Sequence, residues 1–338
     1  MKANLHLHSR FSDGSLFPWQ IAQSAALLGI EAAALTDHDT MGGSEAFVEE
    51  CGRLGLTGVT GCEMDVVEPS IDYRSELLGY FPGRAARDCW STNVLLSQAQ
   101  RERKKRIEYY LYWAQVIFKR PDLTYDDLLR ARIVRGYGVY ENGAVHANAA
   151  RVDAEAGPDV DMDVDDPSQD PQKDPKRYDG LSWSKVDLFL YLRSKGLVPQ
   201  SETYRKFKKE WFVPGRFPKY RLAKPRVEDV VSAVHKDDGF VVVPHFGHLW
   251  NDEIDDMKRD IAHFDALLSY FRRSGVDGIE LYWYTSAGKT EAINSFVLAQ
   301  AAPLGFFFTY GSDCHGPGTD KCTIDKFSGD FNGFGIRS

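Results

Sequence analysis

Polar and apolar residues alternate at the start of the chain, in Asn4-Leu5-His6-Leu7-His8. Because successive side chains of a strand point to opposite faces, we expect His6 and His8 on one face and the leucines in the core. Short apolar runs, typical of buried strands, then alternate with longer amphipathic runs, typical of helices. The helical pattern covers residues 17–28, 43–54, 93–118, 227–237, 257–273 and 286–301. Repeated strand-then-helix units predict an α/β fold with a parallel sheet or barrel.

The alternation is interrupted in the middle of the chain. The interruption begins with the long helix 93–118, whose basic run at 101–106 we interpret as a solvated helix face. Residues 151–179 are rich in Asp and Pro, a composition that cannot bury a core, so we expect a mobile surface segment there. The predicted organisation is an α/β domain of residues 1–92 and 226–338 with an inserted domain of residues 93–225.

Side chains that can bind metal ions gather where the predicted strands end. In α/β barrels the carboxyl ends of the strands form one mouth, and active sites are built there. Imidazole and carboxylate ligands suit zinc, manganese or iron. The side chains are His6, His8 and Asp13 after the first strand, Asp37, His38 and Asp39 after the second, Glu63 after the third, and His245, His248, Asp313 and His315 after later strands. The sequence therefore predicts a multinuclear metal centre.

Other catalytic chemistries fit the sequence less well. There is no G-x-S-x-G elbow for a nucleophilic serine, no Walker A loop and no G-x-G-x-x-G. Cys62 and Cys314 adjoin candidate ligands, but the alternation of a strand turns each thiol away from its neighbour and into the packing. A nucleophilic cysteine is therefore disfavoured.

The overall composition limits the classes of partner and the cellular compartment that we expect. A formal net charge of −8 argues against a basic surface for long nucleic acid, although a bound metal can still attract a small anion. There is no apolar run long enough for a membrane helix and no apolar leader after Met1. The five cysteines are scattered, which is typical of free thiols in a reducing compartment. We expect a cytoplasmic protein without a membrane partner, and the oligomeric state stays open.

The assembled segments resemble the PHP (polymerase and histidinol phosphatase) superfamily of metal-dependent phosphoesterases. The matching segments are HLHSRFSDGS, ALTDHDT, GCEM, VVVPHFGH, GIELYWY and GSDCHG, in the order of the family. The layout is similar to the subgroup that inserts a small helical domain, which includes 3′,5′-bisphosphonucleotide phosphatases and 5′-to-3′ oligonucleotide exonucleases. The resemblance implies a distorted (β/α)7-type barrel with an inserted, mainly helical domain and two or three divalent ions at the barrel mouth.

The resemblance also implies which residues hold each ion. The implied ligands are His6, His8, Glu63 and Asp313 for a first ion, Glu63 and His245 for a second, and Asp13, His38 and His315 for a third. A hydroxide between two ions would attack phosphorus in line, with Glu63 bridging the ions. His248 is a candidate acid for the leaving oxygen.

The chain departs from the family pattern in two places. Glu76 stands where the family has a histidine of the second metal site, so a carboxylate ligand or a weakened site is expected there. His146, in the inserted domain, matches a histidine that approaches the substrate phosphate in relatives, but Ala144 stands where they have an arginine. The second departure puts a bisphosphonucleotide substrate in doubt more than hydrolysis itself.

Three hypotheses follow. The first is a metal-dependent phosphoesterase acting on a small phosphorylated metabolite or nucleotide. The second keeps this chemistry but cuts short oligonucleotides from one end, and the basic run 101–106 is its support. The third is a catalytically weak binding protein that has kept the fold, as Glu76 and Ala144 would allow. The nearly complete ligand set favours an enzyme.

Overall fold

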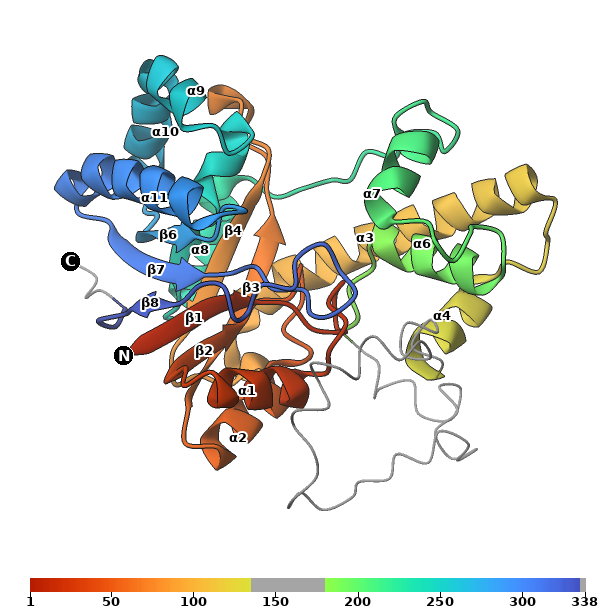
Figure 1. Cartoon of the computed structure of the whole chain (residues 1–338), viewed down its shortest axis with the longest axis horizontal. Coiled ribbons are helices and arrows are strands. Elements are labelled where there is room, and N and C mark those ends of the chain that lie inside the picture. Colours follow the sequence, from red (N-terminus) through yellow and green to blue (C-terminus); the bar gives the residue numbers. More distant parts are fainter. Residues whose placement is uncertain (135–179, 335–338) are drawn as a thin grey trace. The chain divides into compact units, whose positions relative to one another are not determined.

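The computed structural model describes residues 1–134 and 180–334 and divides into two compact units (Figure 1). Unit 1 comprises Met1–Gln100 and Ala223–Ser338, and unit 2 comprises Arg101–Leu222. His146, Ala144 and the acidic segment 151–179 lie outside the described residues.

Unit 1 is built on an eight-stranded sheet with the order β7-β6-β5-β4-β3-β2-β1-β8. The strands are β1 (Lys2–Leu7), β2 (Ala32–Leu35), β3 (Thr57–Asp65), β4 (Glu76–Phe81), β5 (Phe240–Val243), β6 (Gly278–Tyr282), β7 (Phe307–Gly311) and β8 (Gly329–Asp330). Neighbours pair in parallel, except that β4 is antiparallel to β3 and β5, and β8 is antiparallel to β1.

The sheet curls until its two sides almost meet. Leu7, at the end of β1, forms a parallel bridge with Cys314 beyond β7, and the His8 amide donates to the Cys314 carbonyl at 2.9 Å. Deeper in the barrel, the Asn4 side chain donates to Ser312 Oγ at 2.8 Å and accepts from the Ser312 amide at 3.1 Å. The predicted α/β barrel is therefore confirmed.

The direction of β4 is a departure from the simple strand-then-helix pattern. β3 and β4 are joined by residues 66–75, which contain only the short helix η1 (Pro69–Ile71) and no crossover helix. Without a crossover helix, consecutive strands pair as a hairpin and run in opposite directions. Glu76 begins β4 and lies opposite Asp65 at the end of β3, so the start of β4 is at the barrel mouth.

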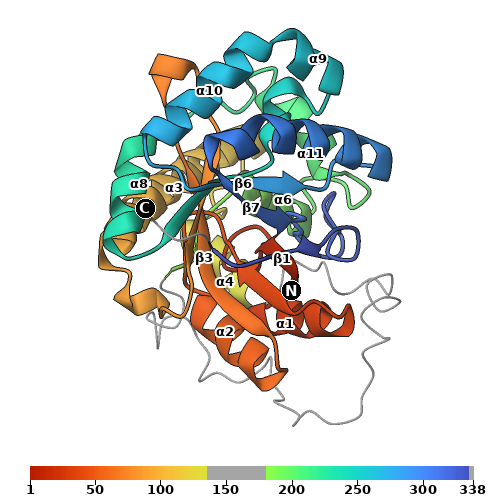
Figure 2. The same ribbon diagram turned by 90° about the vertical axis from the view of Figure 1, so that its left-hand side faces the viewer.

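Helices cover the barrel on two sides, as Figure 2 shows, with α1 and α2 on one side and α8, α10 and α11 on the other. They are α1 (Pro18–Leu27), α2 (Ser44–Arg53), α8 (Val227–Lys236), α9 (Ile254–Arg259), α10 (Ile261–Arg273) and α11 (Ala287–Ala301). The single helix predicted at 257–273 is wrong in one respect, because the chain breaks at Asp260 into α9 and α10. Asp260 leaves the helical conformation (ψ +34°), and its carboxylate accepts a hydrogen bond from the Trp250 indole at 3.1 Å.

Apolar side chains pack in layers around the sheet. One cluster lies between the sheet and α1 and α2 and includes Leu7, Leu35 and Phe47. A larger cluster packs α8, α10 and α11 against the other strands. A further cluster draws almost wholly on the strands themselves, including Leu5, Leu78 and Tyr80, and we place it inside the barrel. This apolar interior forms the floor beneath the polar mouth.

In the described residues of unit 2, the regular secondary structure consists of helices joined by turns and irregular segments. Its elements are the part of α3 (Trp90–Phe118) from residue 101 onward, α4 (Tyr125–Val134), α6 (Lys185–Ser194), α7 (Tyr204–Phe207) and the π-helical turn η6 (Lys208–Phe212). They enclose an aromatic-rich core of their own, with Tyr110, Tyr191 and Phe207 fully buried. Arg103 is an exception to the solvated basic face that the sequence predicted, because it is buried and donates to the Trp183 carbonyl.

Among residues 1–134 and 180–334, the helices include none with the length and apolar character that crossing a membrane requires.

Candidate metal centre

The mouth of the barrel gathers nearly all the side chains that the sequence singled out. The carboxyl ends of β1, β2, β3, β5 and β7 meet there, together with the amino end of β4. Three groups of residues have potential ligand atoms within 4.8 Å of one another. The groups are His8, Asp13, His38 and His315; His6, His8 and Glu63; and Glu63, Glu76 and His245.

Glu63, at the end of β3, is the centre of this arrangement. Its Oε2 atom lies 3.4 Å from His6 Nε2, 3.3 Å from His8 Nε2 and 3.0 Å from His38 Nδ1. Its Oε1 atom lies 3.0 Å from His245 Nε2. The two oxygens therefore face different groups of ligands, as the predicted bridging role requires.

The spacing of the ligand atoms around His6 and His8 fits a metal ion. Two ligands of one tetrahedral ion, each about 2.0–2.1 Å from it, are separated by about 3.3 Å. His8 Nε2 lies 3.1 Å from Asp313 Oδ1 and 3.3 Å from Glu63 Oε2, and His6 Nε2 lies 3.6 Å from Asp313 Oδ1. These separations are compatible with one ion held by His6, His8, Glu63 and Asp313.

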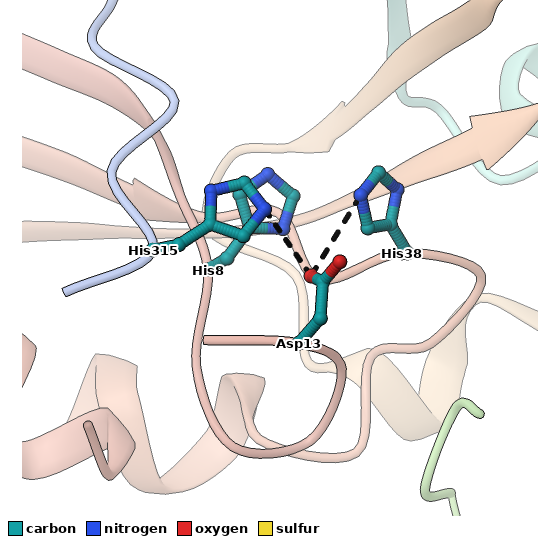
Figure 3. Close-up of side chains that lie close together, drawn as sticks. All are labelled: His8, Asp13, His38 and His315. Carbon is teal, nitrogen blue, oxygen red and sulfur yellow. Dashed lines mark ion pairs between the residues drawn. The ribbon is translucent and has the colours of Figure 1, made fainter. Parts of the chain in front are cut away.

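A second group surrounds Asp13 (Figure 3). Asp13 Oδ1 lies 3.2 Å from His315 Nε2 and 3.8 Å from His38 Nε2. The His8 ring stacks on His315 at 4.3 Å between centroids and so also borders this group. The structure thus brings together the three residues predicted for a third ion and adds His8 at their side.

Glu76 belongs to the group that also contains Glu63 and His245. Its Oε2 atom is 3.9 Å from His245 Nε2 and accepts a hydrogen bond from Ser75 Oγ at 2.8 Å. Burial and then the negative charge of Glu63 raise the pKa of Glu76. A divalent cation between the two carboxylates would offset their repulsion, so the carboxylate at position 76 is placed where a ligand is needed.

Unpaired polar atoms at the mouth indicate what the site is built to hold. Glu63 Oε2, Asp13 Oδ1 and Asp313 Oδ1 are buried without a hydrogen-bond partner among the described residues. Burial would raise the pKa of Glu63, but the positive charges of His38 and His6 and a hydrogen bond from His245 lower it well below its usual value. Buried ionised oxygens without donors are costly unless a cation binds them, so the residues fit divalent ions.

The loops at the mouth are held by buried polar contacts. Asp37, which sequence reasoning placed near the site, does not face the ligand groups. It accepts hydrogen bonds from the Ser9 amide at 2.7 Å and from Ser12 Oγ at 2.5 Å. These bonds fix the turn that carries Asp13. His245 and Asp313 both adopt positive φ angles (30° and 51°), a strained conformation that the surrounding contacts must stabilise.

Sequence reasoning missed Glu280, on β6. Its Oε1 atom lies 2.8 Å from His6 Nδ1, and its Oε2 atom accepts the His245 amide at 2.8 Å. A carboxylate on Nδ1 of a histidine orients the ring and leaves Nε2 free for a metal. The signal was present in the sequence, because a glutamate inside the apolar strand GIELYWY requires a buried partner.

The sequence analysis also did not identify Lys321, because this residue lies in the irregular segment after β7. Its Nζ atom contacts Asp313 Oδ2, and its side chain remains partly exposed. Tyr282 approaches the same oxygen at 3.4 Å. The Lys321 backbone is held in place by its carbonyl, which accepts the His315 amide at 2.8 Å. The loop therefore brings a cation to the mouth.

His248 lies beside the site, with its ring 4.5 Å from that of His245 and Nε2 3.8 Å from Asp252 Oδ1. Burial, followed by the charges of His245 and Lys321, lowers the pKa of His248 to about 2. A lowered pKa favours the neutral ring, which can donate a hydrogen bond but carries no extra proton for general acid catalysis. Cys62 and Cys314 are buried, and burial raises the pKa of each thiol, so neither is a ready nucleophile.

Chelation is expected to destabilise the protein. Removing ions leaves the unpaired oxygens of Glu63, Asp13 and Asp313 uncompensated, and a ligand present at a hundred times its Kd contributes about 2.7 kcal/mol to folding. The protein is treated with EDTA, and the EDTA is then removed. Its Tm should be several degrees lower than before treatment and should recover when Mn²⁺ or Zn²⁺ is added. An unchanged Tm, once elemental analysis shows that the ions have been removed, would contradict this assignment.

Comparison with known proteins gives matches over part of the chain. Residues 4–130 match the PHP domain family. DNA polymerase III subunit alpha of Treponema pallidum is 40% identical over 75 residues, which are 22% of this chain and 6% of the polymerase subunit. The 3′,5′-nucleoside bisphosphate phosphatase of Chromobacterium violaceum is 40% identical over 63 residues, 19% of this chain and 22% of the phosphatase. The chain thus spans only a small fraction of these relatives.

A solved structure extends the similarity of fold to nearly the whole chain. A protein from Bifidobacterium adolescentis, classed as a metal-dependent phosphoesterase, superimposes with a TM-score of 0.60. The match covers 94% of this chain and 89% of the other at 20% sequence identity. At this identity the match supports the fold alone.

Proposed function

We propose that this chain, whose residues 4–130 match the PHP domain family, hydrolyses phosphate esters with the help of divalent metal ions. The observation that carries the proposal is the position of Glu63, whose two oxygens face different groups of ligand atoms at one barrel mouth. Two or three ions, Zn, Mn or Fe, would lower the pKa of a bound water and offset the charge of the phosphate.

The residues of the chain would prepare this chemistry by holding ligands in fixed orientations. Glu280 orients the His6 ring through Nδ1 and fixes the His245 backbone. Asp313 orients His315, whose Nδ1 lies 2.9 Å from the Asp313 carbonyl oxygen, so that Nε2 faces Asp13. Lys321 adds a positive charge suited to a phosphate oxygen, and His248 would donate a hydrogen bond to the leaving oxygen.

The substrate we propose is a small phosphorylated metabolite or nucleotide, as the family resemblance implies. A short oligonucleotide is the second candidate, and the basic run 101–106 is its support. Three substrates test the proposal with Mn²⁺ or Zn²⁺ added: a 3′,5′-bisphosphonucleotide, a short oligonucleotide and a chromogenic phosphate monoester. The products measured are inorganic phosphate, mononucleotides and the chromophore, respectively. Turnover of at least one of them that EDTA abolishes is expected. If none is hydrolysed by the metal-loaded protein, the binding-protein hypothesis replaces the enzyme.

Glu76→His is expected to retain the metal content of the wild type, because a histidine is the ligand that the family resemblance implies at this place. Metal per chain should be measured by elemental analysis on protein purified without chelator. We expect near three ions in the wild type and no more in Glu76→His, since Glu76 already lies beside His245. Two ions or fewer in the wild type, with a rise in the variant, would show that Glu76 leaves the second site depleted.

A further inference from the structure

Asp313 divides its two carboxylate oxygens between different partners. Its Oδ1 atom lies 3.1 Å from His8 Nε2 and 3.6 Å from His6 Nε2, and it has no hydrogen-bond partner among the described residues. Its Oδ2 atom contacts Lys321 Nζ and lies 3.4 Å from the Tyr282 hydroxyl. One oxygen is thus turned towards the candidate metal ligands, and the other contacts a cation that belongs to the chain itself.

The segment that carries Lys321 is fastened to the residues that follow β7. The His315 amide donates to the Lys321 carbonyl at 2.8 Å. Two residues further on, the Thr323 hydroxyl donates to the Ser312 carbonyl at 2.8 Å. On the other side of Lys321, Thr319 Oγ1 accepts the Lys321 amide at 3.2 Å. These bonds prepare the position of the ammonium group before a ligand arrives, which lowers the cost of binding one.

The ammonium group of Lys321 has donors to spare. It carries three N–H groups. Among residues 1–134 and 180–334, its hydrogen bonds and ion pairs involve Asp313 alone. The Lys321 side chain is 42% exposed, whereas that of Asp313 is 3% exposed. Lys321 can therefore contact Asp313 and a ligand at the barrel mouth at the same time.

Tyr282 places this cation in the same part of the mouth as His248. The Tyr282 hydroxyl approaches Asp313 Oδ2, and its ring packs edge-on against that of His248, with 5.0 Å between centroids. The His248 ring in turn lies 4.5 Å from that of His245. Lys321 and the candidate hydrogen-bond donor for the leaving oxygen are thus both next to candidate metal ligands.

A fixed cation at this place distinguishes two kinds of phosphate ester. A terminal phosphomonoester carries nearly two negative charges at neutral pH, because its second pKa is about 6. A phosphate within a nucleic-acid backbone carries only one. The attraction to an ammonium group grows with the charge of the anion, and the monoester also has three non-bridging oxygens that can accept a hydrogen bond, where the diester has two.

We propose that Lys321 binds a non-bridging oxygen of the substrate phosphate and thereby makes the metal centre prefer a terminal phosphomonoester to a phosphodiester. This inference rests on the proposed function, because it places a phosphate ester at the metal centre. Of the two candidate substrates, it favours the small phosphorylated metabolite or nucleotide over the internal linkages of an oligonucleotide. Specificity of this kind is a difference between two affinities, so it can be measured as such.

The binding of two anions tests the proposal without requiring turnover. Full-length protein is loaded with Mn²⁺, freed of excess ion and studied by titration calorimetry at about pH 8. The anions are inorganic phosphate, which is mainly a dianion under these conditions, and dimethyl phosphate, which is a monoanion. We expect Lys321→Met to raise the Kd of inorganic phosphate about tenfold, as the loss of one hydrogen bond to a charged group would, and that of dimethyl phosphate less than about threefold. Lys321→Arg restores the charge and should recover most of the affinity for inorganic phosphate.

Lys326→Met is the matched control. Lys326 lies in the same segment and is half exposed, but it pairs with Asp325 at 3.0 Å instead of with a candidate metal ligand. This variant should bind both anions like the wild type. The metal content of every variant, measured by elemental analysis, should equal that of the wild type.

The proposal is overturned if the wild type does not bind inorganic phosphate, if Lys321→Met binds it like the wild type, or if the variant loses equal affinity for both anions. Loss of metal from Lys321→Met would also overturn it, because Lys321 would then act only by positioning Asp313. Absence of hydrolysis is a separate result. It would contradict the proposed function, while the two Kd values would still decide the role of Lys321.

Discussion

Replacing Glu63 by glutamine is expected to remove both metal binding and turnover. The carboxylate faces His6, His8 and His38 with one oxygen and His245 with the other, so an amide would withdraw the one negative charge that these groups share. Glutamine has nearly the same size, so the change tests charge and ligation rather than packing. We expect kcat/KM to fall by about a thousandfold or more, which corresponds to about 4 kcal/mol.

Glu50→Gln provides the matched control for this experiment. Glu50 is also a largely buried glutamate of unit 1, but it lies on α2 and pairs with Arg53 at 2.9 Å. The control should keep both its metal content and its activity. Metal content measured by elemental analysis gives a readout independent of substrate. If Glu63→Gln retained wild-type metal and turnover, the shared carboxylate would have no bridging role.

The strands and most of the site could be anticipated because their signals are local. The alternation around His6 and His8, and the polar residues directly after apolar runs, need only the geometry of a single strand. The end of the barrel at which Glu76 lies could not be derived in this way. Its place at the mouth depends on β4 running antiparallel to its neighbours, which is a property of the β3–β4 pairing.

Other features depend on contacts between distant segments. Glu280 contacts His6 across 274 positions of sequence, and Lys321 reaches Asp313 from a loop that has no regular pattern.

Gly311→Ala is expected to damage the metal centre although residue 311 is not a ligand. A Cβ atom added to Gly311, at the end of β7, would approach both Glu280 Oε1 and the Cβ atom of His6 to under 3.0 Å. Neither side chain can move away easily, because both are buried and they form an ion pair with each other. Overpacking of a core costs about 1–3 kcal/mol, and displacing the buried Glu280 carboxylate from His6 would add to it.

The Tm and metal content of Gly311→Ala should be compared with those of a control variant in which another glycine is replaced. The comparison separates this effect from the general effect of a glycine-to-alanine substitution on stability. Around Gly288, in the first turn of α11, there is no atom within 4 Å of an added Cβ, so Gly288→Ala should leave Tm unchanged or slightly raised. Gly311→Ala should lower Tm by several degrees and lose metal even where the protein stays folded. Shortening the carboxylate with Glu280→Asp in the Gly311→Ala background should recover part of the Tm. If Gly311→Ala bound metal like the wild type, the Glu280–His6 contact would not be what holds the His6 ring in place.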